Sequence, residues 1–285
     1  MQSLVGRVDS FFVNDEFATF TDNESRVRLR LDADHWENAG WDVAPRVRLQ
    51  LVMPGLQRRL RLVVNDGDVE ESGQPVEDDL KDNDIAFRWV NDEDDRIKLS
   101  YDLGLRISGS GVDPFVRFNA GMSYPVAQHW QGQTTNRLFH YVKRGWRNDL
   151  AQTFDRSLAD DLLLRSRSRI QYFQNRRHNP TLEQKFSLFH TLDEQSVLAY
   201  EVLWRQRSEE DSVYGDDALL VEPRSHYDQF AIQARYRRNI VRPWFFVEFW
   251  PILYWPEERD YEASLAARIR VEVNLGDNGK LALDD

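Results

Sequence analysis

Arginine is the residue type whose spacing in this chain most clearly suggests chemistry. In several segments arginines stand at every second position, as in Arg28 and Arg30 or in Arg165, Arg167 and Arg169. A guanidinium group keeps its charge at physiological pH, and its planar fork binds oxyanions through paired hydrogen bonds. Arginines around a narrow water-filled space would concentrate anions and repel cations. The arginines expected to line such a space are Arg28, Arg30, Arg46, Arg48, Arg59, Arg61, Arg88, Arg106, Arg117, Arg165, Arg167, Arg169, Arg205, Arg207, Arg235, Arg237, Arg268 and Arg270.

The same arginines could instead brace the protein by pairing with carboxylates. A carboxylate on a neighbouring strand would neutralise an arginine and hold it in place. For any single arginine this structural role stays open, whereas for the whole set we expect a net positive potential. The acidic residues scattered among the arginine-rich segments are Asp32, Asp102, Asp149, Glu201, Glu248 and Glu272.

Residue types that support covalent catalysis or metal binding are few. Cysteine is absent, which removes disulfides, thiolate nucleophiles and cysteine metal ligands together. The segment RSRSR at 165–169 resembles part of a motif of outer-membrane phospholipases, but the histidine and serine pattern that should precede it is missing. The histidines lie far apart, and none has the spacing of a metal-binding pair: His35, His129, His140, His178, His190 and His226. The sequence therefore predicts no catalytic residue, no metal ligand and no cofactor.

The elements that must position the arginines show a period of two. In the segment from Arg26 to Asp34, Val27, Leu29 and Leu31 alternate with Arg28 and Arg30. Successive side chains of a strand point to opposite faces, so each such segment has an apolar face and a charged face. The pattern predicts about fourteen strands, with twelve possible. They cover 26–34, 43–53, 58–65, 84–91, 96–108, 114–125, 130–142, 146–156, 161–174, 182–192, 196–207, 226–238, 244–255 and 262–275.

The lengths of the connections between these strands favour a membrane barrel. Outer-membrane barrels join their strands by short turns on the periplasmic side and by longer loops outside. Four short connections, which are Pro54 to Gln57, Asn91 to Asp95, Ser157 to Asp160 and Leu192 to Gln195, are each even-numbered in the strand count. The two long ones, Asp66 to Asn83 and Ser208 to Ser225, are odd-numbered and acidic. We therefore expect both termini in the periplasm and much of the net charge of -11 in outer loops.

Alternation alone would also fit a soluble sandwich or barrel, but other features favour lipid on the apolar side. Charged residues make up 30% and aromatic residues 12% of the chain, an unusual combination for a plain soluble core. The apolar stripe runs for up to about 12 residues, longer than in most soluble strands. Aromatic residues expected near strand ends, as in an interfacial girdle, are Trp89, Tyr124, Trp130, Tyr141, Trp204, Trp244 and Trp255.

The ends of the chain follow different patterns. In residues 1–24, Leu4, Val8, Phe11 and Phe12 recur at helical spacing, which predicts a short amphipathic helix or plug before a barrel at 25–275. Residues 276–285 form a C-terminal tail. The first twenty residues lack an apolar signal core, so we expect an exported chain whose signal peptide has already been removed.

Several segments together resemble a family of largely uncharacterised proteobacterial outer-membrane proteins. They are GRVDSFF at 6–12, SRVRLRL at 25–31, PGLQRRL at 54–60, DPFVRF at 113–118, DLLLRSR at 161–167, YRRNI at 236–240 and the aromatic segment 244–256. The resemblance spans nearly the whole chain and implies an outer-membrane location and a barrel, without a ligand or a catalytic set. The chain departs from such barrels at its end, because the last predicted strand is followed by a tail instead of a terminal aromatic residue.

The sequence therefore predicts an all-β protein with one antiparallel transmembrane β-barrel in the bacterial outer membrane. The expected function is that of a porin or channel for small anionic solutes, embedded as a monomer in lipid and lipopolysaccharide. One alternative is a closed structural or binding barrel that anchors a periplasmic or surface protein partner. Another is an outer-membrane lipid hydrolase. The net charge of -11 argues against nucleic acid as a partner, because phosphate contacts need a basic surface.

Overall fold

The protein forms a single closed antiparallel barrel in a computed structural model. The structure describes residues 4–12, 25–37, 40–53, 60–66, 83–91, 97–108, 111–174, 180–207 and 227–276. A helix, α1 (Leu4–Phe12), precedes fourteen strands, and a short 3-10 helix, η2 (Glu257–Arg259), precedes the last of them. The strands are β1 (Arg26–Trp36), β2 (Gly40–Val52), β3 (Leu60–Asp66), β4 (Asn83–Asn91), β5 (Ile97–Ser108), β6 (Gly111–Ala127), β7 (Trp130–Tyr141), β8 (Gly145–Ser157), β9 (Leu162–Phe173), β10 (Thr181–Thr191), β11 (Ser196–Arg207), β12 (Tyr227–Asn239), β13 (Phe245–Pro256) and β14 (Ser264–Gly276).

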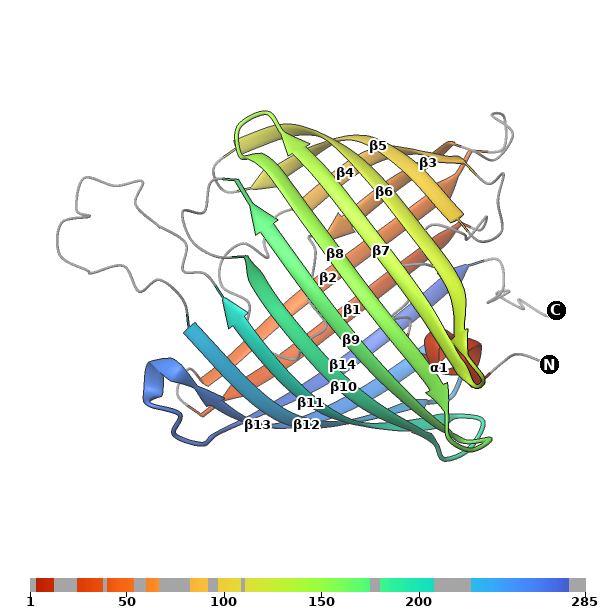
Figure 1. The fold of residues 1–285 in the computed structure, drawn as a ribbon, viewed down its shortest axis with the longest axis vertical. Coiled ribbons are helices and arrows are strands. Elements are labelled where there is room, and N and C mark those ends of the chain that lie inside the picture. Colours follow the sequence, from red (N-terminus) through yellow and green to blue (C-terminus); the bar gives the residue numbers. More distant parts are fainter. Residues whose placement is uncertain are drawn as a thin grey trace.

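Each strand pairs with its neighbours in the sequence, and β14 closes the barrel against β1 (Figure 1). The closing seam is long, because it runs from the pair Arg26 and Gly276 to the pair Trp36 and Ala266. Closure leaves no exposed sheet edge between first and last strand, which is the condition for a β-structure in a membrane. The predicted barrel and its strand number are confirmed, and the largest difference in bounds is at β6, which extends beyond 114–125 at both ends.

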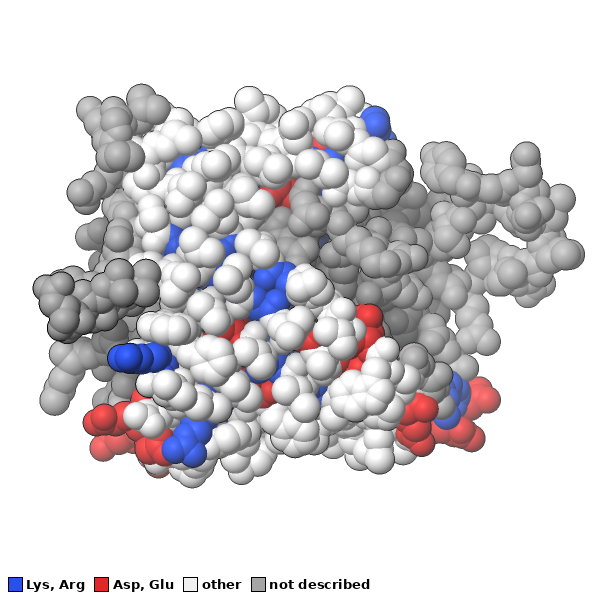
Figure 2. All heavy atoms as spheres, turned by 180° about the vertical axis from the view of Figure 1, so that it is seen from behind, with Lys and Arg blue, Asp and Glu red and all other residues white. Residues whose placement is uncertain are grey.

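The side chains of the strands alternate between an exposed apolar face and a buried polar face. In β5, Tyr101, Leu103 and Leu105 are exposed, whereas Asp102 and Arg106 between them are buried. Seen from behind, most of the described wall is uncharged, and the largest charged groups lie at the two lower corners of the view (Figure 2). A wall with apolar side chains outside and charges inside is stable where acyl chains replace water, so the barrel is built for a membrane.

The described residues include no helix that is long and apolar enough to cross a membrane.

The predicted parity of the connections holds in part, because odd-numbered turns such as 142–144 between β7 and β8 are also short. The even-numbered turns lie at the same end as the two termini, and the described ones are short, such as 128–129 between β6 and β7.

In the turn between β10 and β11, a hydrogen bond with Ser196 and one from the Gln195 backbone N–H lower the pKa of the Asp193 carboxyl. The predicted acidic loops, the short connections at 54–57 and 92–95, and the tail after Gly276 lie outside the described residues.

The seam between β2 and β3 is much shorter than the others in the described residues. β2 pairs with β1 along its length from Gly40 to Gln50, but with β3 only from Leu49 to Val52. β3 is itself fully paired with β4, from Leu60 and Trp89 to Asp66 and Asn83. The described ladder is therefore continuous around the barrel but narrow at this one seam.

The helix α1 packs inside the end of the barrel where the termini lie (Figure 1). Leu4 and Val8 are buried against Leu163, Phe189 and Val197, which point inward from β9, β10 and β11. The Phe11 ring meets the Phe246 ring edge to face, at 5.6 Å between centroids. The apolar face of α1 thus fills an apolar part of the inner wall.

The strand β7 differs most clearly from the predicted alternation. Tyr141 of β7, expected in an outer aromatic girdle, is instead buried with Phe115 and Phe139 inside the barrel. The inward positions of β7 carry aromatic rings and its outward positions carry Thr134 and Asn136, which reverses the usual polarity there. The prediction for Tyr141 was wrong, because a position near a strand end does not by itself say which face the side chain occupies.

Candidate functional site: the charged interior

The described arginines of the predicted set lie on the inner face of the barrel. Arg28, Arg30, Arg46, Arg48 and Arg167 are half-buried, and the others are buried: Arg61, Arg88, Arg106, Arg117, Arg165, Arg169, Arg205, Arg235, Arg237, Arg268 and Arg270. Arg59 lies outside the described residues, as does the side chain of Arg207. These arginines lie on one face because, within each strand, they occupy every second position, and side chains at every second position point the same way.

A chain of alternating charges runs along the inner wall from β1 to β10. It begins at Arg30, whose Nε lies 2.9 Å from Glu272, and continues to Arg237, 2.7 Å from the same carboxylate. Arg237 also contacts Glu248, 3.0 Å away, and Glu248 accepts a hydrogen bond from Arg235 at 2.9 Å.

The same chain ends in a group around Glu201. This carboxylate lies 3.6 Å from Arg235 and 3.8 Å from Lys185, and it accepts hydrogen bonds from Ser187 and Gln233. Glu201 and Arg235 are almost completely buried. An ion-pair chain of this kind satisfies buried charges that would otherwise be costly in a low-dielectric interior.

Other carboxylates each hold a separate group of arginines. Asp102 accepts two hydrogen bonds from Arg88, at 2.8 and 2.9 Å, and one from Arg117 at 2.6 Å. Asp149 contacts Arg169 at 2.8 Å and Arg137 at 3.0 Å. Paired hydrogen bonds also join Arg106 to Asp84, Arg165 to Asp155, Arg205 to Glu183, Arg268 to Asp34 and Arg270 to Asp32. Much of the inner wall is thus braced by fork-shaped arginine–carboxylate pairs.

Arginines of two neighbouring strands face each other on the inner wall at β1 and β2. Arg28 stands directly opposite Arg48, and Arg30 stands opposite Arg46, so like charges face each other across this strand pair. We call these four residues the β1–β2 arginine patch. The nearby carboxylates are Asp32, 3.5 Å from Arg46, and Glu272, 2.9 Å from Arg30 and 3.9 Å from Arg28.

Two arginines of this patch are also more accessible than the arginines at the centre of the ion-pair chain. The side chains of Arg28 and Arg46 are 13% and 12% exposed, whereas those of Arg235 and Arg237 are 0% exposed. Facing like charges in a strand pair are unfavourable unless anions lie close to them. An oxyanion bound at the patch would therefore reduce the repulsion between these arginines.

Aromatic rings pack against the buried guanidinium groups. The Arg235 guanidinium lies 4.0 Å from the centre of the Trp250 ring, and those of Arg268 and Arg270 lie 5.1 and 4.9 Å from the same ring. On the other side of the barrel, Arg117 lies 5.2 Å from the centre of the Phe139 ring. These contacts hold the arginine planes in fixed orientations and leave their edges directed at carboxylates.

Some inward cations were missing from the predicted set. Arg137 and Arg147 contact Asp149, at 3.0 and 3.7 Å, and Lys185 contacts Glu201. Arg137 lies in β7, where the reversed polarity hides the alternation. Strand pairing would have revealed them. Arg147 stands opposite Phe139 and Lys185 stands opposite Arg167, and both of these partners point inward.

The candidate catalytic motif has another role in the structure. Arg165, Arg167 and Arg169 point inward, while Ser166 and Ser168 point outward and hydrogen-bond Gln184. The described histidines of the strands pack at the ends of the barrel, as in the contact of the His140 ring with the Trp146 ring at 4.5 Å between centroids. Within the described residues no cluster of histidine and acidic side chains could hold a metal ion.

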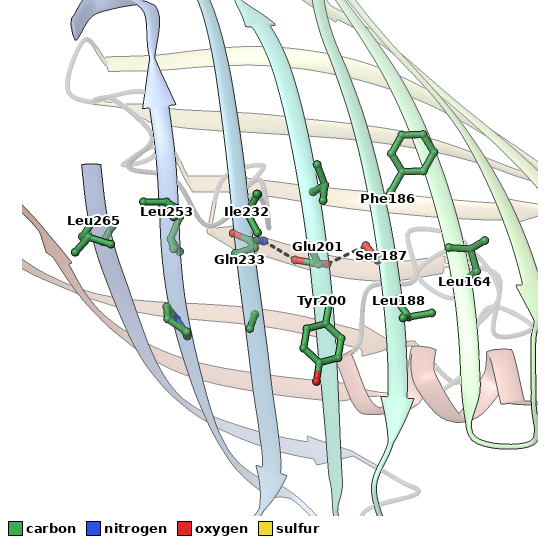
Figure 3. A pocket seen from close by; sticks show the side chains of 15 residues that line it. Leu164, Phe186, Ser187, Leu188, Tyr200, Glu201, Ile232, Gln233, Leu253 and Leu265 are labelled. Carbon is green, nitrogen blue, oxygen red and sulfur yellow. Dashed lines mark hydrogen bonds between the residues drawn. The ribbon is translucent and has the colours of Figure 1, made fainter. Parts of the chain in front are cut away.

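A separate depression lies on the apolar outer wall of β9 to β14 (Figure 3). Its volume is about 510 Å³, and outward side chains such as Phe186, Tyr200 and Leu265 line it. Glu201 lies behind its floor, where its bonds to Ser187 and Gln233 belong to the inner wall. The depression therefore opens toward lipid and is not part of the charged interior.

Comparisons with known proteins find likeness in shape only. No protein-family model matches the chain, and no curated protein matches it. Its structural neighbours include outer-membrane β-barrels. The CymD monoaromatic hydrocarbon channel has a TM-score of 0.49 at 10% identity, with 94% of this chain and 92% of that chain covered.

Two other neighbours have still lower sequence identity. OmpT, an outer membrane protein of Vibrio cholerae, has a TM-score of 0.49 at 8% identity, with 89% of this chain and 98% of that chain covered. The KdgM porin has a TM-score of 0.40 at 6% identity, with 86% and 98% covered. At such values the solutes of these proteins do not transfer to this chain.

Proposed function

We propose that this protein is a channel of the bacterial outer membrane that binds and passes small anionic solutes along the β1–β2 arginine patch. The observation that carries the proposal is the facing arrangement of Arg28 with Arg48 and of Arg30 with Arg46 on the inner wall. Within the patch, Arg30 is itself hydrogen-bonded to Glu272, at 2.9 Å. A solute anion would add counter-charge to this strand pair, and it would bind more weakly than a built-in carboxylate and so could leave.

The test is the ion selectivity of the purified barrel in a planar lipid bilayer. Under a salt gradient, the wild-type protein should give a reversal potential that shows anion preference. The double substitution Arg46→Gln with Arg48→Gln should move this potential toward zero, because it removes two accessible positive charges. A matched control, Arg165→Gln with Asp155→Asn, removes a buried ion pair without changing the net charge and should leave the potential unchanged.

Folding of each variant is checked by its heat-dependent mobility in gel electrophoresis, so that a lost current is not mistaken for a lost barrel. Cation preference, or a potential that ignores the loss of Arg46 and Arg48, would contradict the proposal.

A closed barrel that serves as an anchor or binding platform is a second candidate. Two observations favour it: α1 occupies the inner space near Phe189 and Leu163, and the ion-pair chain around Glu248 is fully buried. A folded protein that stays silent in the bilayer, and stays silent after α1 is removed, would support this function over the channel.

A further inference from the structure

A row of neutral polar side chains crosses the outer face of the barrel from β7 to β10. Thr134 stands opposite Gln152, Gln152 opposite Ser168, and Ser168 opposite Gln184. We call these four residues the polar row. They have the same parity as Leu150, Ile170 and Phe186, which are exposed on the outer wall. The polar row therefore lies on the face that meets acyl chains, near the middle of its strands.

The members of the polar row are linked by hydrogen bonds. Thr134 donates to Oε1 of Gln152 at 2.6 Å, and the Tyr124 hydroxyl donates to the same oxygen at 3.1 Å. Ser168 donates to Oε1 of Gln184, whose amide nitrogen donates to Ser166 at 3.1 Å.

A second polar pair extends the row toward the other end of the barrel. Asn136 and Asn148 exchange amide hydrogen bonds in both directions, each at 3.3 Å. The polar surface thus covers four adjacent strands, which at strand spacings of about 4.8 Å is a band roughly 15 Å wide.

Such a band is unfavourable against lipid. Acyl chains offer no hydrogen-bond partner. The Gln152 amide is satisfied within the chain, because its nitrogen donates to the Gln133 and Thr153 carbonyls at 3.0 and 3.1 Å. The Ser168 hydroxyl and Oε1 of Gln184, however, have acceptor lone pairs that lipid cannot fill. Ser168 remains exposed to the outside. By contrast, the outward positions of β5 are apolar along the strand, as at Leu103 and Leu105. In membranes, neutral polar side chains of this kind hold protein segments together.

We propose that the polar row is the contact surface for a second copy of this chain, so that the barrel is a dimer in the membrane. The row contains no charged group, which disfavours lipid phosphate or a metal ion as its occupant. Each amide and hydroxyl is both donor and acceptor, so the surface is complementary to itself when rotated about a two-fold axis. An axis at Ser168, the exposed member of the row, would bring the Ser168 side chains of the two copies together.

The absence of cysteine allows a direct test by disulfide formation. In the single variant Ser168→Cys, oxidation in lipid vesicles should convert the protein to a covalent dimer that a reductant reverses. The matched control Val47→Cys places a thiol at a half-exposed outward position of β2, about half-way round the barrel, and should stay monomeric.

A second variant tests whether the polar row holds the dimer. In the Ser168→Cys background, Gln152→Leu with Gln184→Leu should lower the dimer yield at least about tenfold, because it removes the amide contacts. Unchanged folding is shown by heat-dependent electrophoretic mobility.

Three results would overturn the proposal. One is a folded Ser168→Cys protein that forms no dimer in vesicles and whose introduced thiol reacts with lipid-soluble thiol reagents as fast as the thiol of the Val47→Cys control. Another is equal cross-linking of the two single variants, which would show random collision. The third is an undiminished dimer yield after the loss of Gln152 and Gln184.

Discussion

An arginine inside this barrel behaves according to how closely carboxylates surround it. Arg237 lies between Glu248 and Glu272 and has no exposed surface, so its charge is fixed in place as part of the wall. Arg46 faces Arg30 and lies 3.5 Å from Asp32, with part of its side chain exposed. The first arrangement stabilises the fold, whereas the second presents positive charge where a solute can reach it.

Loss of Arg237 should therefore destabilise the barrel strongly. Arg237→Gln leaves two buried carboxylates, Glu248 and Glu272, without the cation that they share, at an expected cost of about 3–5 kcal/mol in the free energy of unfolding. Urea unfolding in lipid vesicles, followed by tryptophan fluorescence, measures this cost.

The matched control is Arg144→Gln in the turn after β7. The Arg144 side chain is 35% exposed and lies 3.9 Å from Asp113, so its removal should cost less than about 1 kcal/mol. Equal unfolding midpoints for the two variants would show that the buried ion-pair chain contributes little to stability.

Strand alternation placed many of the inward arginines on the correct face, but it missed Arg137 and Arg147 and could not predict the partners of any of them. Parity within a strand follows from neighbouring residues, so Arg235 and Arg237 could be placed on the inner face from their own segment. The pairing of Arg237 with Glu272 depends on the register of β12, β13 and β14, and the two residues are 35 positions apart. Register is set by long-range contacts that alternation alone does not encode.

At the scale of elements, α1 has the position of a plug. Its residues Leu4 and Val8 fill a place on the inner wall that Leu163 and Phe189 keep apolar amid charged neighbours. An apolar patch in a polar, water-filled interior is unfavourable unless another apolar surface covers it. The helix and the patch therefore form one unit.

The substitution Val8→Asp should release the helix from this patch. Val8 is 1% exposed, and an unpaired charge there should cost about 3–5 kcal/mol. This cost would lower the equilibrium constant for packing of α1 against the inner wall more than about a hundredfold. If α1 blocks the passage, the current carried by the variant in a planar bilayer should rise, while Val8→Ile should behave as the wild type. An unchanged current in Val8→Asp would mean that α1 does not control the passage.

The strands themselves were predicted well because most have a clean alternation, as in β5. β7 shows where that signal fails. Its inner positions include Phe139 and Tyr141, and its outer positions include Thr134 and Asn136, so hydropathy points the wrong way. The two faces of β7 depend on the neighbouring strands. Its inward aromatic rings pack with Phe115 of β6, and its outward Thr134 is hydrogen-bonded to Gln152 of β8.

At the scale of the whole molecule, the distribution of apolar surface requires lipid around the barrel. Leu103 in the middle of β5 is 66% exposed, although a soluble protein would bury such a residue. The protein should consequently aggregate in buffer without detergent and fold in detergent micelles or lipid vesicles.

The depth of each outward residue should show in the cost of adding a charge. Leu103→Arg, at mid-strand, should destabilise the barrel by about 2–4 kcal/mol, whereas Leu192→Arg in the turn after β10 should change stability by less than about 1 kcal/mol. Unfolding titrations in vesicles measure both. Equal small costs would place Leu103 in water and would remove the membrane interpretation of the outer wall.

The narrow seam between β2 and β3 has a mechanical consequence. A closed barrel under tension opens where the fewest pairs of strand residues must separate at once, and among the described residues that place is the stretch from Leu49 to Val52. Pulled from one end by the tip of a force microscope, the barrel should lose its hairpins in steps, with the weakest rupture peak when β2 separates from β3. The cylinder would then unroll from that line as a sheet whose two borders are β2 and β3.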